Sequence, residues 1–462
     1  MKNSRATSGT TPVPSAGEAD SRNAGKARAA IRAGVLAYFV DQFDIYLPVV
    51  SLAPATAYFE STHVDAGTAA ILSAMIFAST LFGRPVGSMI FGHFADTIGR
   101  RKSTLVAVAG FGITTALIAA MPGYATLGIG SVSLLIALRF IDGIFLGGEY
   151  TTAVPLAMEW TRKRRRGIVS GTITCTSPGA YAVIAAITLL LLSVMPSAGV
   201  NSAYAQWGWR IPFIIGACLA VVLFRSYLKE VEDPQTTRQH RGASPLKALL
   251  SGPHRRSLAQ VFVLMTGLWL ATNSTIVVLP TLLKSHVGMP NQQATIVMLV
   301  ASAIAAATYP LLGALSQRIG RRRFYIGWGL LMSTAGVTTY GLGVAPVGNT
   351  ATTVVLCTIA TIIGIGTYGP IAAYLTERFP TEIRATGYGV GYSLSIIIPG
   401  FYAFYLDGIG SIMPSYYAPL VLVGVAGLLI TIGALLGPET KGVDMHADSA
   451  SLPRFAAADT AG

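Results

Sequence analysis

Long apolar stretches that carry almost no charge run through the whole sequence and limit what the chain can fold into. Only 11% of its 462 residues are charged, whereas an ordinary soluble domain contains about 25%. The stretches are long enough for helices of about 20 residues, the length that crosses a bilayer. They are continuous rather than short and alternating, which argues against a transmembrane β-barrel. The sequence therefore excludes a soluble enzyme and predicts an all-α membrane protein embedded in the lipid bilayer.

The breaks between the apolar stretches predict twelve transmembrane helices, a number that the chain length accommodates. The first 30 residues are rich in small and polar residues and are predicted to be disordered. They do not resemble a secretory signal, because no short apolar core precedes a small-residue cleavage site. The predicted spans cover about residues 31–58, 68–95, 104–122, 129–158, 167–194, 209–227, 258–283, 293–316, 324–344, 351–376, 385–406 and 418–437.

The basic residues are distributed unevenly between the two sides of these spans. If the amino terminus is cytoplasmic, 29 of the 33 Lys and Arg residues fall in cytoplasmic loops and tails. This asymmetry follows the positive-inside rule and predicts that both termini are cytoplasmic. It also accounts for the net charge of +13, so we expect no nucleic-acid partner.

Two sequence patterns occur twice at nearly the same spacing and indicate a duplicated unit of six spans. A Gly-x3-Asp-x2-Gly-Arg-Arg loop after span 2 returns after span 8, at an offset of 221 residues, with Gln317 in place of the Asp. A Glu followed seven residues later by Arg occurs after span 4 and again after span 10, at an offset of 218 residues. The loops contain Gly92, Asp96, Gly99, Arg100 and Arg101, then Gly313, Gly320, Arg321 and Arg322, and the Glu-Arg pairs are Glu159 with Arg166 and Glu377 with Arg384.

The repeat predicts two pseudo-symmetric six-helix bundles, an architecture typical of transporters that bind their substrate between the halves. We expect the first bundle to cover residues 31–227 and the second to cover residues 258–437. A cytoplasmic linker at 228–257 joins them, and cytoplasmic tails cover 1–30 and 438–462.

The repeated loop resembles the signature of the major facilitator superfamily, and further motifs resemble its metabolite:proton symporter family. These motifs are Arg84-Pro85-x-Gly87 in span 2, Gly147-Gly148-Glu149-Tyr150 in span 4, Trp209-Arg210-x-Pro212-Phe213 at the start of span 6 and Tyr368-Gly369-Pro370 in span 10. The resemblance implies a proton-coupled carrier that works by alternating access. The chain departs from the family pattern within the membrane, where Asp41-Gln42-Phe43-Asp44 replaces Glu-Trp-Tyr-Asp and Asp142 replaces a usual Gln.

Ionisable residues near the middle of the predicted spans are the first functional candidates, because each costs at least about 2.5 to 3.5 kcal/mol to insert. The four carboxyls and two arginines are Asp41, Asp44, Asp142, Glu149, Arg84 and Arg139. Their surplus of negative charge cannot persist at low dielectric, so at least one carboxyl should carry a proton. The resemblance implies that Asp44 faces Arg139. We assign the four acids and Arg139 to proton coupling, with Asp44 as the carrier; the alternative is a static ion network that only fixes helix packing.

Arg84 precedes Pro85 in the middle of span 2, where the proline removes a backbone hydrogen bond. It can present a planar guanidinium to a substrate carboxylate, or it can pair with a span 1 aspartate or with loosened backbone carbonyls. The second half offers polar and aromatic side chains as further substrate-binding candidates, for which packing is the alternative. These candidates are Asn273, Tyr309, Tyr368 and Tyr392.

The repeated motifs are interpreted as a conformational latch between the halves on the cytoplasmic side. Asp96, at the end of span 2, can accept hydrogen bonds from the start of span 11 and pair with a nearby arginine. The glycines, acids and arginines of both loops and both Glu-Arg pairs belong to this predicted latch. Gln317 predicts a weaker latch in the second half. The alternative is charge that only sets topology, which suffices for the basic residues 162–165.

No catalytic or cofactor-binding arrangement accompanies these residues. All six histidines lie outside the predicted lipid core, and the sequence has no visible metal or haem ligand set and no nucleophile-histidine pair. A Gly-x4-Gly-Lys-Ser/Thr loop for ATP is missing as well. We therefore expect no enzyme activity, no cofactor and no bound metal. A passive channel is a weaker alternative, because it would not need titratable pairs in one half only.

The sequence thus predicts a secondary active transporter of a bacterial inner membrane that acts as a monomer. We expect it to import a small organic acid together with protons by alternating access. The additional acids Asp41 and Asp142 leave a zwitterionic or cationic solute as the alternative substrate. Export instead of uptake is a further alternative.

Overall fold

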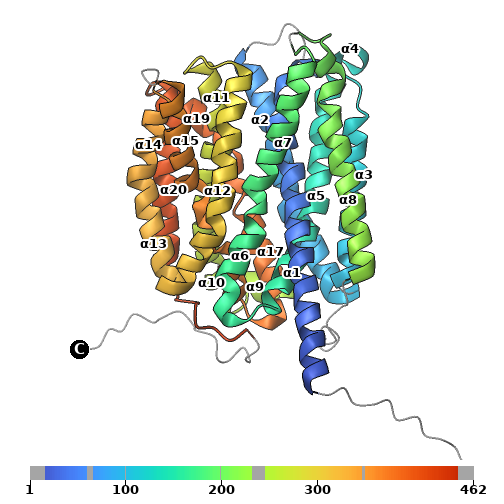
Figure 1. Ribbon diagram of the computed structural model, residues 1–462, viewed down its shortest axis with the longest axis vertical. Coiled ribbons are helices and arrows are strands. Elements are labelled where there is room, and N and C mark those ends of the chain that lie inside the picture. Colours follow the sequence, from blue (N-terminus) through green and yellow to red (C-terminus); the bar gives the residue numbers. More distant parts are fainter. Residues whose placement is uncertain are drawn as a thin grey trace, which may run out of the picture.

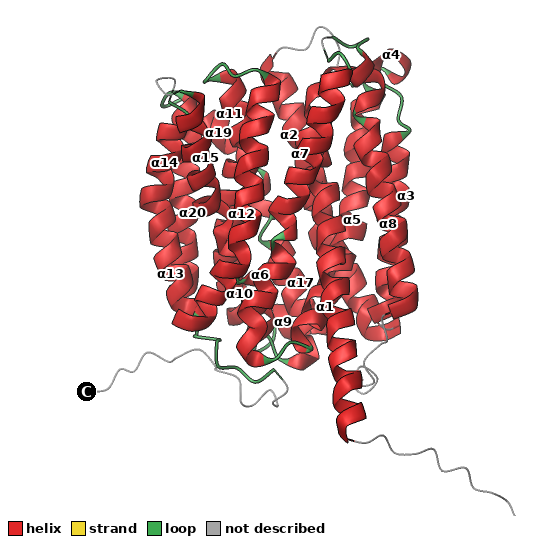
Figure 2. Cartoon of the chain, viewed as in Figure 1, coloured by secondary structure: helices red, strands yellow, loops and turns green. Residues whose placement is uncertain are grey.

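A computed structural model describes residues 16–59, 66–98, 100–197, 199–230, 245–345 and 349–445. Within these ranges the chain forms helices and no β-strand (Figure 2). The long helices stand side by side, and α1 begins on the same side of the molecule on which the described chain ends (Figure 1). We call this side the tail side.

The first half forms one bundle of six membrane-length helical segments. Its helices are α1 (Ala16–Leu47), α2 (Ala66–Ile98), α3 (Arg100–Ala119), α5 (Gly130–Glu159), α6 (Arg166–Thr174) continued by α7 (Thr176–Val194), and α8 (Arg210–Glu230). A short α4 (Tyr124–Leu127) lies in the loop before α5. The prediction of a disordered tail is wrong for residues 16–30, which form the first turns of α1. Their Ala-rich composition favours helix beyond the apolar stretch.

The second half forms the other bundle, in which several helices are interrupted. Its helices are α10 (Arg255–Thr272), η6 (Asn273–Val278) and α11 (Leu279–Ser285); α12 (Asn291–Ile319); α13 (Arg321–Leu331), η7 (Met332–Gly336) and α14 (Val337–Gly343); α15 (Thr350–Ile365) and α16 (Ile371–Arg378); α17 (Arg384–Leu394), α18 (Ile397–Gly400) and α19 (Tyr402–Gly410); and α20 (Ala418–Leu435). Within the predicted linker, α9 covers Pro245–Leu250, and residues 231–244 lie outside the described ranges.

Among the described residues, 11 helical segments are long and apolar enough to cross a membrane. The predicted span at 324–344 is not one of them. It corresponds to α13, η7 and α14, which follow one another without a break but contain three arginines at the start and several Gly, Ser and Thr residues. With this segment the fold consists of twelve helices in two bundles, as predicted.

Glycines bring α2 and α5 into backbone contact. A Cβ atom added at Gly87 of α2 would overlap the carbonyl group of Ile144, and one added at Gly147 of α5 would overlap the carbonyl group of Arg84. Larger residues at these positions would force the two helices apart. The close contact places Arg84 directly beside α5.

The two halves meet along two sets of helices. In one set α6 and α7 pack against α12, and in the other α17 packs against α2 and α5. Gly167 of α6 and Gly313 of α12 face each other so closely that a Cβ atom on either would overlap the backbone of the other. Gly171 approaches the carbonyl group of Tyr309 in the same way. The halves are therefore in direct backbone contact near the tail side.

Candidate functional site

A triad of charged side chains is buried inside the first bundle. Nη1 of Arg139 lies 2.8 Å from Oδ2 of Asp44 and 3.1 Å from Oδ2 of Asp142. Thr115 donates a hydrogen bond to Oδ1 of Asp44 at 2.8 Å, and Thr114 donates one to Oδ1 of Asp142 at 2.9 Å. The contact between Asp44 and Arg139 is the one that the family resemblance implies.

Two carboxylates of this triad share one guanidinium nitrogen. Helix α1 supplies Asp44, α5 supplies Arg139 and Asp142, and α3 supplies Thr114 and Thr115. The fully ionised triad would therefore carry one negative charge in a place that water does not reach. Such a charge is costly to bury, and one bound proton removes it. The arrangement can thus hold and release a proton.

Arg84 of α2 and Asp41 of α1 form a second buried ion pair. Nη2 of Arg84 lies 3.1 Å from Oδ2 of Asp41, and the same oxygen accepts a hydrogen bond from Gln42 at 2.9 Å. Gln42 in turn accepts one from Ser177 of α7 at 2.7 Å. Of the alternatives for Arg84, pairing with a span 1 aspartate is therefore present. Asp41 and Asp44 are one turn apart on α1, yet each has its own arginine.

Arg84 also faces residues at the junction between the halves. Its guanidinium carbon lies 4.5 Å from the ring centre of Tyr150 and 6.0 Å from that of Tyr392 on α17. Nε and Nη1 of Arg84 have no hydrogen-bond partner among the described residues. Buried donors without a partner are costly. These N–H groups can donate hydrogen bonds to a substrate carboxylate.

Glu149, the remaining buried acid, lies about two turns further along α5 from Asp142, toward the tail side. The charges of Asp41 and Arg84 act on it. It therefore belongs with the Arg84 pair rather than with the triad.

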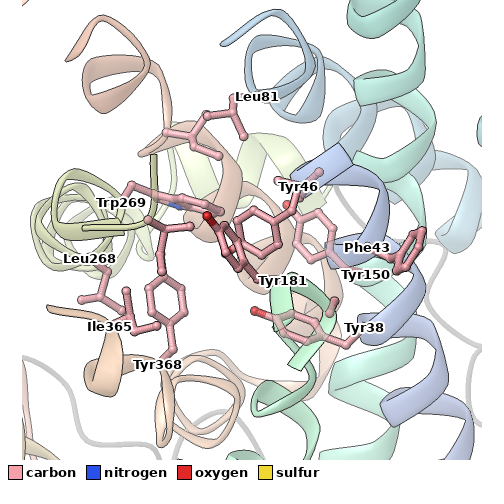
Figure 3. Close-up of a cluster of buried hydrophobic side chains, with 14 of the residues drawn as sticks. Tyr38, Phe43, Tyr46, Leu81, Tyr150, Tyr181, Leu268, Trp269, Ile365 and Tyr368 are labelled. Carbon is pink, nitrogen blue, oxygen red and sulfur yellow. The ribbon is translucent and has the colours of Figure 1, made fainter. Parts of the chain in front are cut away.

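Aromatic side chains of both halves fill the junction around Arg84. Figure 3 shows Trp269 and Tyr368 of the second half opposite Tyr46, Tyr150 and Tyr181 of the first. The hydroxyl oxygens of Tyr38 and Tyr392 lie 3.0 Å apart, and Tyr150 donates a hydrogen bond to the backbone O of Gly389 at 3.0 Å. Both contacts cross from one half to the other.

The second half lines this junction with neutral groups. Trp269 packs edge-on against Tyr392 and Tyr368, with ring centres 5.2 Å and 5.9 Å apart. Thr272 donates a hydrogen bond to the hydroxyl of Tyr368 at 3.2 Å, and Asn273 donates one to the backbone O of Pro399 at 2.8 Å. The structure thus brings Tyr368 and Tyr392 to Arg84 or its neighbours, and it places Tyr309 in α12 at the α6 contact.

Two ion pairs join the halves on the tail side. Arg384 Nη1 lies 3.0 Å from Glu159 Oε1, and Arg166 Nη1 lies 3.9 Å from Glu377 Oε1. Each glutamate therefore pairs with an arginine of the other half, not with the arginine that follows it seven residues later in its own motif. We call these contacts the exchanged ion pairs. The sequence singled out these residues but did not reveal the exchange.

The segment after α20 lies across these ion pairs. Arg166 donates a hydrogen bond to the backbone O of Val443 at 2.8 Å, and Arg384 donates one to the backbone O of Met445 at 2.9 Å. Thr440 donates one to Glu377 at 2.9 Å, and Met445 is completely buried. The sequence prediction treated 438–462 as a plain tail and missed this strap of residues 440–445. Its only signal was the apolar Val443 and Met445 after a charged stretch.

The signature loops make contacts within each half as well as between them. Arg101 donates a hydrogen bond to the backbone O of Tyr227 at 3.3 Å, at the end of α8, and Arg322 donates one to the backbone O of Leu435 at 3.1 Å, at the end of α20. These arginines satisfy carbonyls at helix ends of their own half. The latch role of these two arginines stays a prediction.

The second loop does reach the other half through Gln317. Its Oε1 accepts a hydrogen bond from the backbone N of Gly167 at 3.2 Å and one from Arg321 at 2.6 Å. Arg321 also lies 3.2 Å from Glu377. Gly320 has a φ of +103°, which favours glycine, and a Cβ atom there would overlap Glu439.

The first loop is described only in part. Gly92 lies in α2, where a Cβ atom would be 3.7 Å from Oγ1 of Thr386 on α17. Gly99 and the side chains of Asp96 and Arg100 lie outside the described residues. The contact predicted for Asp96 stays a prediction.

The described ranges contain no group of three or more His, Cys, Asp or Glu side chains that is arranged to hold a metal ion. The side chains missed by the sequence prediction are neutral partners of the charged ones: Thr114, Thr115, Tyr38, Tyr150 and Trp269. Thr114 and Thr115 had no signal beyond two polar residues in an apolar stretch, whereas Tyr150 directly follows Glu149 in a motif that the sequence did show.

The family of the chain is shown by sequence comparison. The family model of the Major Facilitator Superfamily matches residues 34–403 and, in a second match, residues 261–450. The chain therefore belongs to the Major Facilitator Superfamily, whose members in this comparison are membrane transporters rather than enzymes.

Relatives of known function narrow the class further. Over 417 residues the chain is 30% identical to the alpha-ketoglutarate permease of Escherichia coli (strain K12), covering 87% of the chain and 92% of the permease. It is 28% identical to the citrate-proton symporter of Salmonella typhi, covering 78% and 82%, and 27% identical to the proline/betaine transporter of Salmonella typhimurium, covering 88% and 83%. The chain is a transporter of the metabolite-carrying kind.

The fold is also that of a solved structure, the proton:xylose symporter XylE bound to 6-bromo-6-deoxy-D-glucose. The TM-score is 0.73 at 17% identity, with 92% of this chain and 98% of the symporter covered. At this identity the likeness shows the fold alone.

Proposed function

We propose that the protein takes up a small organic acid together with protons. The observation that carries this proposal is Arg84, a completely buried arginine at the junction of the halves, two of whose nitrogens lack a hydrogen-bond partner among the described residues. A substrate carboxylate satisfies these donors and the positive charge at once. Relatives named for alpha-ketoglutarate and for citrate and protons support the same substrate class.

The proton is held by the triad of Asp44, Arg139 and Asp142. Helix α1 connects the two sites, because it carries Asp41 at the substrate site and Asp44 at the triad one turn away. A substrate carboxylate on Nε and Nη1 of Arg84 competes with Asp41 for the positive charge of the same guanidinium and weakens the contact between Arg84 and Asp41. The resulting shift of α1 changes the distance between Asp44 and Arg139, and this links substrate binding to proton binding.

Alternating access follows from the contacts on the tail side. In this state the two exchanged ion pairs and the strap hold the tail side closed. The positive-inside distribution of Lys and Arg makes the tail side cytoplasmic, so in this state the cytoplasmic side is closed. Opening to the cytoplasm requires that the ion pairs of Glu159 and Glu377 and the strap hydrogen bonds break together. We infer a monomer in a bacterial inner membrane, the location named for one relative, the inner membrane metabolite transport protein YhjE of E. coli.

A second candidate substrate is a zwitterion or a cation. The observation that favours it is the excess of buried acids, since Asp41, Asp44, Asp142 and Glu149 face only two buried arginines in the spans. A relative named for proline and betaine fits this candidate.

Uptake into proteoliposomes that contain the purified full-length protein tests the proposal. A panel of organic acids, zwitterions and amines is offered with and without an inwardly directed proton gradient, and protein-free liposomes measure leak. We expect accumulation of at least one organic acid that depends on the gradient. Accumulation of zwitterions or amines alone would contradict the proposal.

A further inference from the structure

We infer that the transported acid is a monocarboxylate with a flat, aromatic body. This inference rests on the proposed function and names the substrate class for the same site. It is argued from the number of buried cations that a substrate can reach and from the groups that line the junction.

Among the residues that the structure describes, Arg84 is the only buried cation that offers a substrate unused hydrogen-bond donors on two nitrogens. Arg139 is taken up by Asp44 and Asp142 inside the first bundle, and its Nη2 also donates to the backbone O of Asp44 at 3.1 Å. A guanidinium has five N–H donors, and on Arg84 the Nε and Nη1 donors remain without a partner in the described structure. Arg84 can therefore receive one substrate carboxylate.

The second half offers no place for another carboxylate. Its predicted spans contain no Asp, Glu, Lys, Arg or His; they cover residues 258–283, 293–316, 324–344, 351–376, 385–406 and 418–437. A second carboxylate on the substrate would be buried against neutral side chains, at a high desolvation cost. It would also add to an excess of acids that already exists, so a further proton would be needed for each added charge.

The groups that do line the junction suit a flat ring. Tyr150 and Tyr392 have ring centres 5.0 Å apart, and Trp269 meets Tyr392 and Tyr368 edge-on. Tyr46 and Tyr181 form another edge-on pair, with centres 5.4 Å apart (Figure 3). Aromatic rings prefer such offset and edge-to-face contacts. Of these pairs, Tyr150 with Tyr392 is the one that joins the halves, and a substrate ring can take its place with similar geometry.

A further group near Arg84 fits the carboxylate end of such a substrate. The ring of Tyr388 is parallel to that of Tyr392, with centres 6.1 Å apart, and lies 6.3 Å from the ring of Tyr150. Its buried hydroxyl has no hydrogen-bond partner among the described residues. Arg84 and Tyr388 together can bind both oxygens of one carboxylate.

The same geometry disfavours a quaternary ammonium group. The rings of Tyr150 and Tyr392 already lie near the guanidinium of Arg84, at 4.5 Å and 6.0 Å, so their cation-binding faces are in use. The quaternary ammonium group of a betaine would have to lie beside the guanidinium of Arg84, and the two positive charges would repel each other. The inference thus separates this chain from relatives named for alpha-ketoglutarate, citrate and proline/betaine.

Equilibrium binding to the full-length protein in nanodiscs, followed by counterflow in proteoliposomes, tests the inference. The probes are 4-hydroxybenzoate, cyclohexanecarboxylate, 2-oxoglutarate and glycine betaine. We expect 4-hydroxybenzoate to bind at least about tenfold more tightly than 2-oxoglutarate and glycine betaine, and more tightly than cyclohexanecarboxylate, which has the same charge but no flat ring. Protein-free liposomes measure the leak of each acid.

The possible results distinguish this inference from the proposed function. Preferential binding and proton-driven uptake of 2-oxoglutarate would overturn the inference and leave the proposed function standing. Binding of none of the four would overturn the inference alone, because the proposed function is tested with the wider panel of acids. Binding of glycine betaine alone would overturn both.

A pair of tryptophan variants separates ring contact from general damage. Trp269→Leu should reduce the preference for 4-hydroxybenzoate over cyclohexanecarboxylate by about fivefold. Trp269 donates a hydrogen bond to the backbone O of Tyr392 at 2.9 Å. Trp328→Leu is the matched control, because Trp328 likewise donates one to the backbone O of Ile363, at 2.8 Å, but its ring stacks on Phe324. It should leave the preference unchanged. Equal loss of both acids in the Trp269 variant would refute the ring contact.

Discussion

The two halves of this protein share a repeat and a bundle architecture, but they differ in what they bury. The first half buries four acids and two arginines in its spans. The second half places only neutral side chains at the same depth, among them Trp269, Tyr368 and Tyr392. Each ionisable group in a bilayer carries its own insertion cost, so the charges gain most when they pair with one another within one bundle. The difference indicates that one half handles charge and protons and the other recognises substrate shape.

The largest effect is expected when the proton site of the first half is fixed in its neutral form. Asp44→Asn keeps the size of the side chain but cannot bind and release a proton. We expect loss of accumulation driven by a proton gradient, whereas counterflow at equal pH stays measurable. Uptake in proteoliposomes with and without a gradient checks this, and normal gradient-driven uptake by the variant would rule out Asp44 as the carrier.

The substrate arginine should show the next largest effect. Arg84→Lys keeps the positive charge but loses the planar donors that serve Asp41 and the substrate together. We expect the half-saturation constant for the organic acid to rise by about tenfold or more, which corresponds to about 1.4 kcal/mol. An unchanged half-saturation constant would indicate that Arg84 does not contact the substrate, which is expected if the substrate is a cation.

Asp142 distinguishes proton binding from substrate binding within the first half. Asp142→Gln leaves one carboxylate, Asp44, on Arg139, so the triad becomes neutral without a proton. We expect half-maximal uptake to require a proton concentration about tenfold higher, because the second negative charge no longer attracts the proton. The affinity for the acid should not change. A weaker affinity at an unchanged pH dependence would instead place Asp142 at a cationic substrate.

Much of the fold and part of the site could be predicted from the sequence, because the patterns that indicate them have direct physical causes. Apolar length, charge asymmetry and the repeat predict twelve helices in two bundles, which the structure and the family confirm. The intramembrane charges identified Asp44, Arg84 and Arg139 as candidates, since a buried charge needs a reason to be there. The motif Tyr368-Gly369-Pro370 lies where the helix is interrupted between α15 and α16, because Gly and Pro both disfavour a continuous helix.

The remaining features depend on which helices contact one another, and a single sequence does not contain this information. Asp41 and Asp44 lie on nearly the same face of α1, so nothing in their spacing assigns one to Arg84 and the other to Arg139. The exchange of partners between Glu159 and Glu377 arises only when the bundles meet. Residues 440–445 look like a tail because their contacts are made by backbone carbonyls, which every residue has.

The smallest effect is expected on the tail side, where many contacts share the task of closing the protein. Arg384→Met removes the ion pair with Glu159 and the hydrogen bond to the backbone O of Met445. A charge-assisted contact of this kind contributes about 1.5 to 3 kcal/mol, and the variant should shift the population toward the state that is open on the tail side. Cysteine pairs that report on the two openings, or accessibility to a membrane-impermeant thiol reagent, measure the shift.

Arg322→Met is the matched control for this variant. Arg322 is also an arginine of the repeated motifs on the tail side, but its contacts are to backbone carbonyls at the end of α20 in its own half. Its loss should lower stability without changing which side is open, because both states keep this contact. If the two variants shifted accessibility equally, the closure of the tail side would depend on total charge rather than on the contacts between the halves. A shift in the Arg384 variant alone would show that the exchanged ion pairs and the strap hold the two unlike halves together.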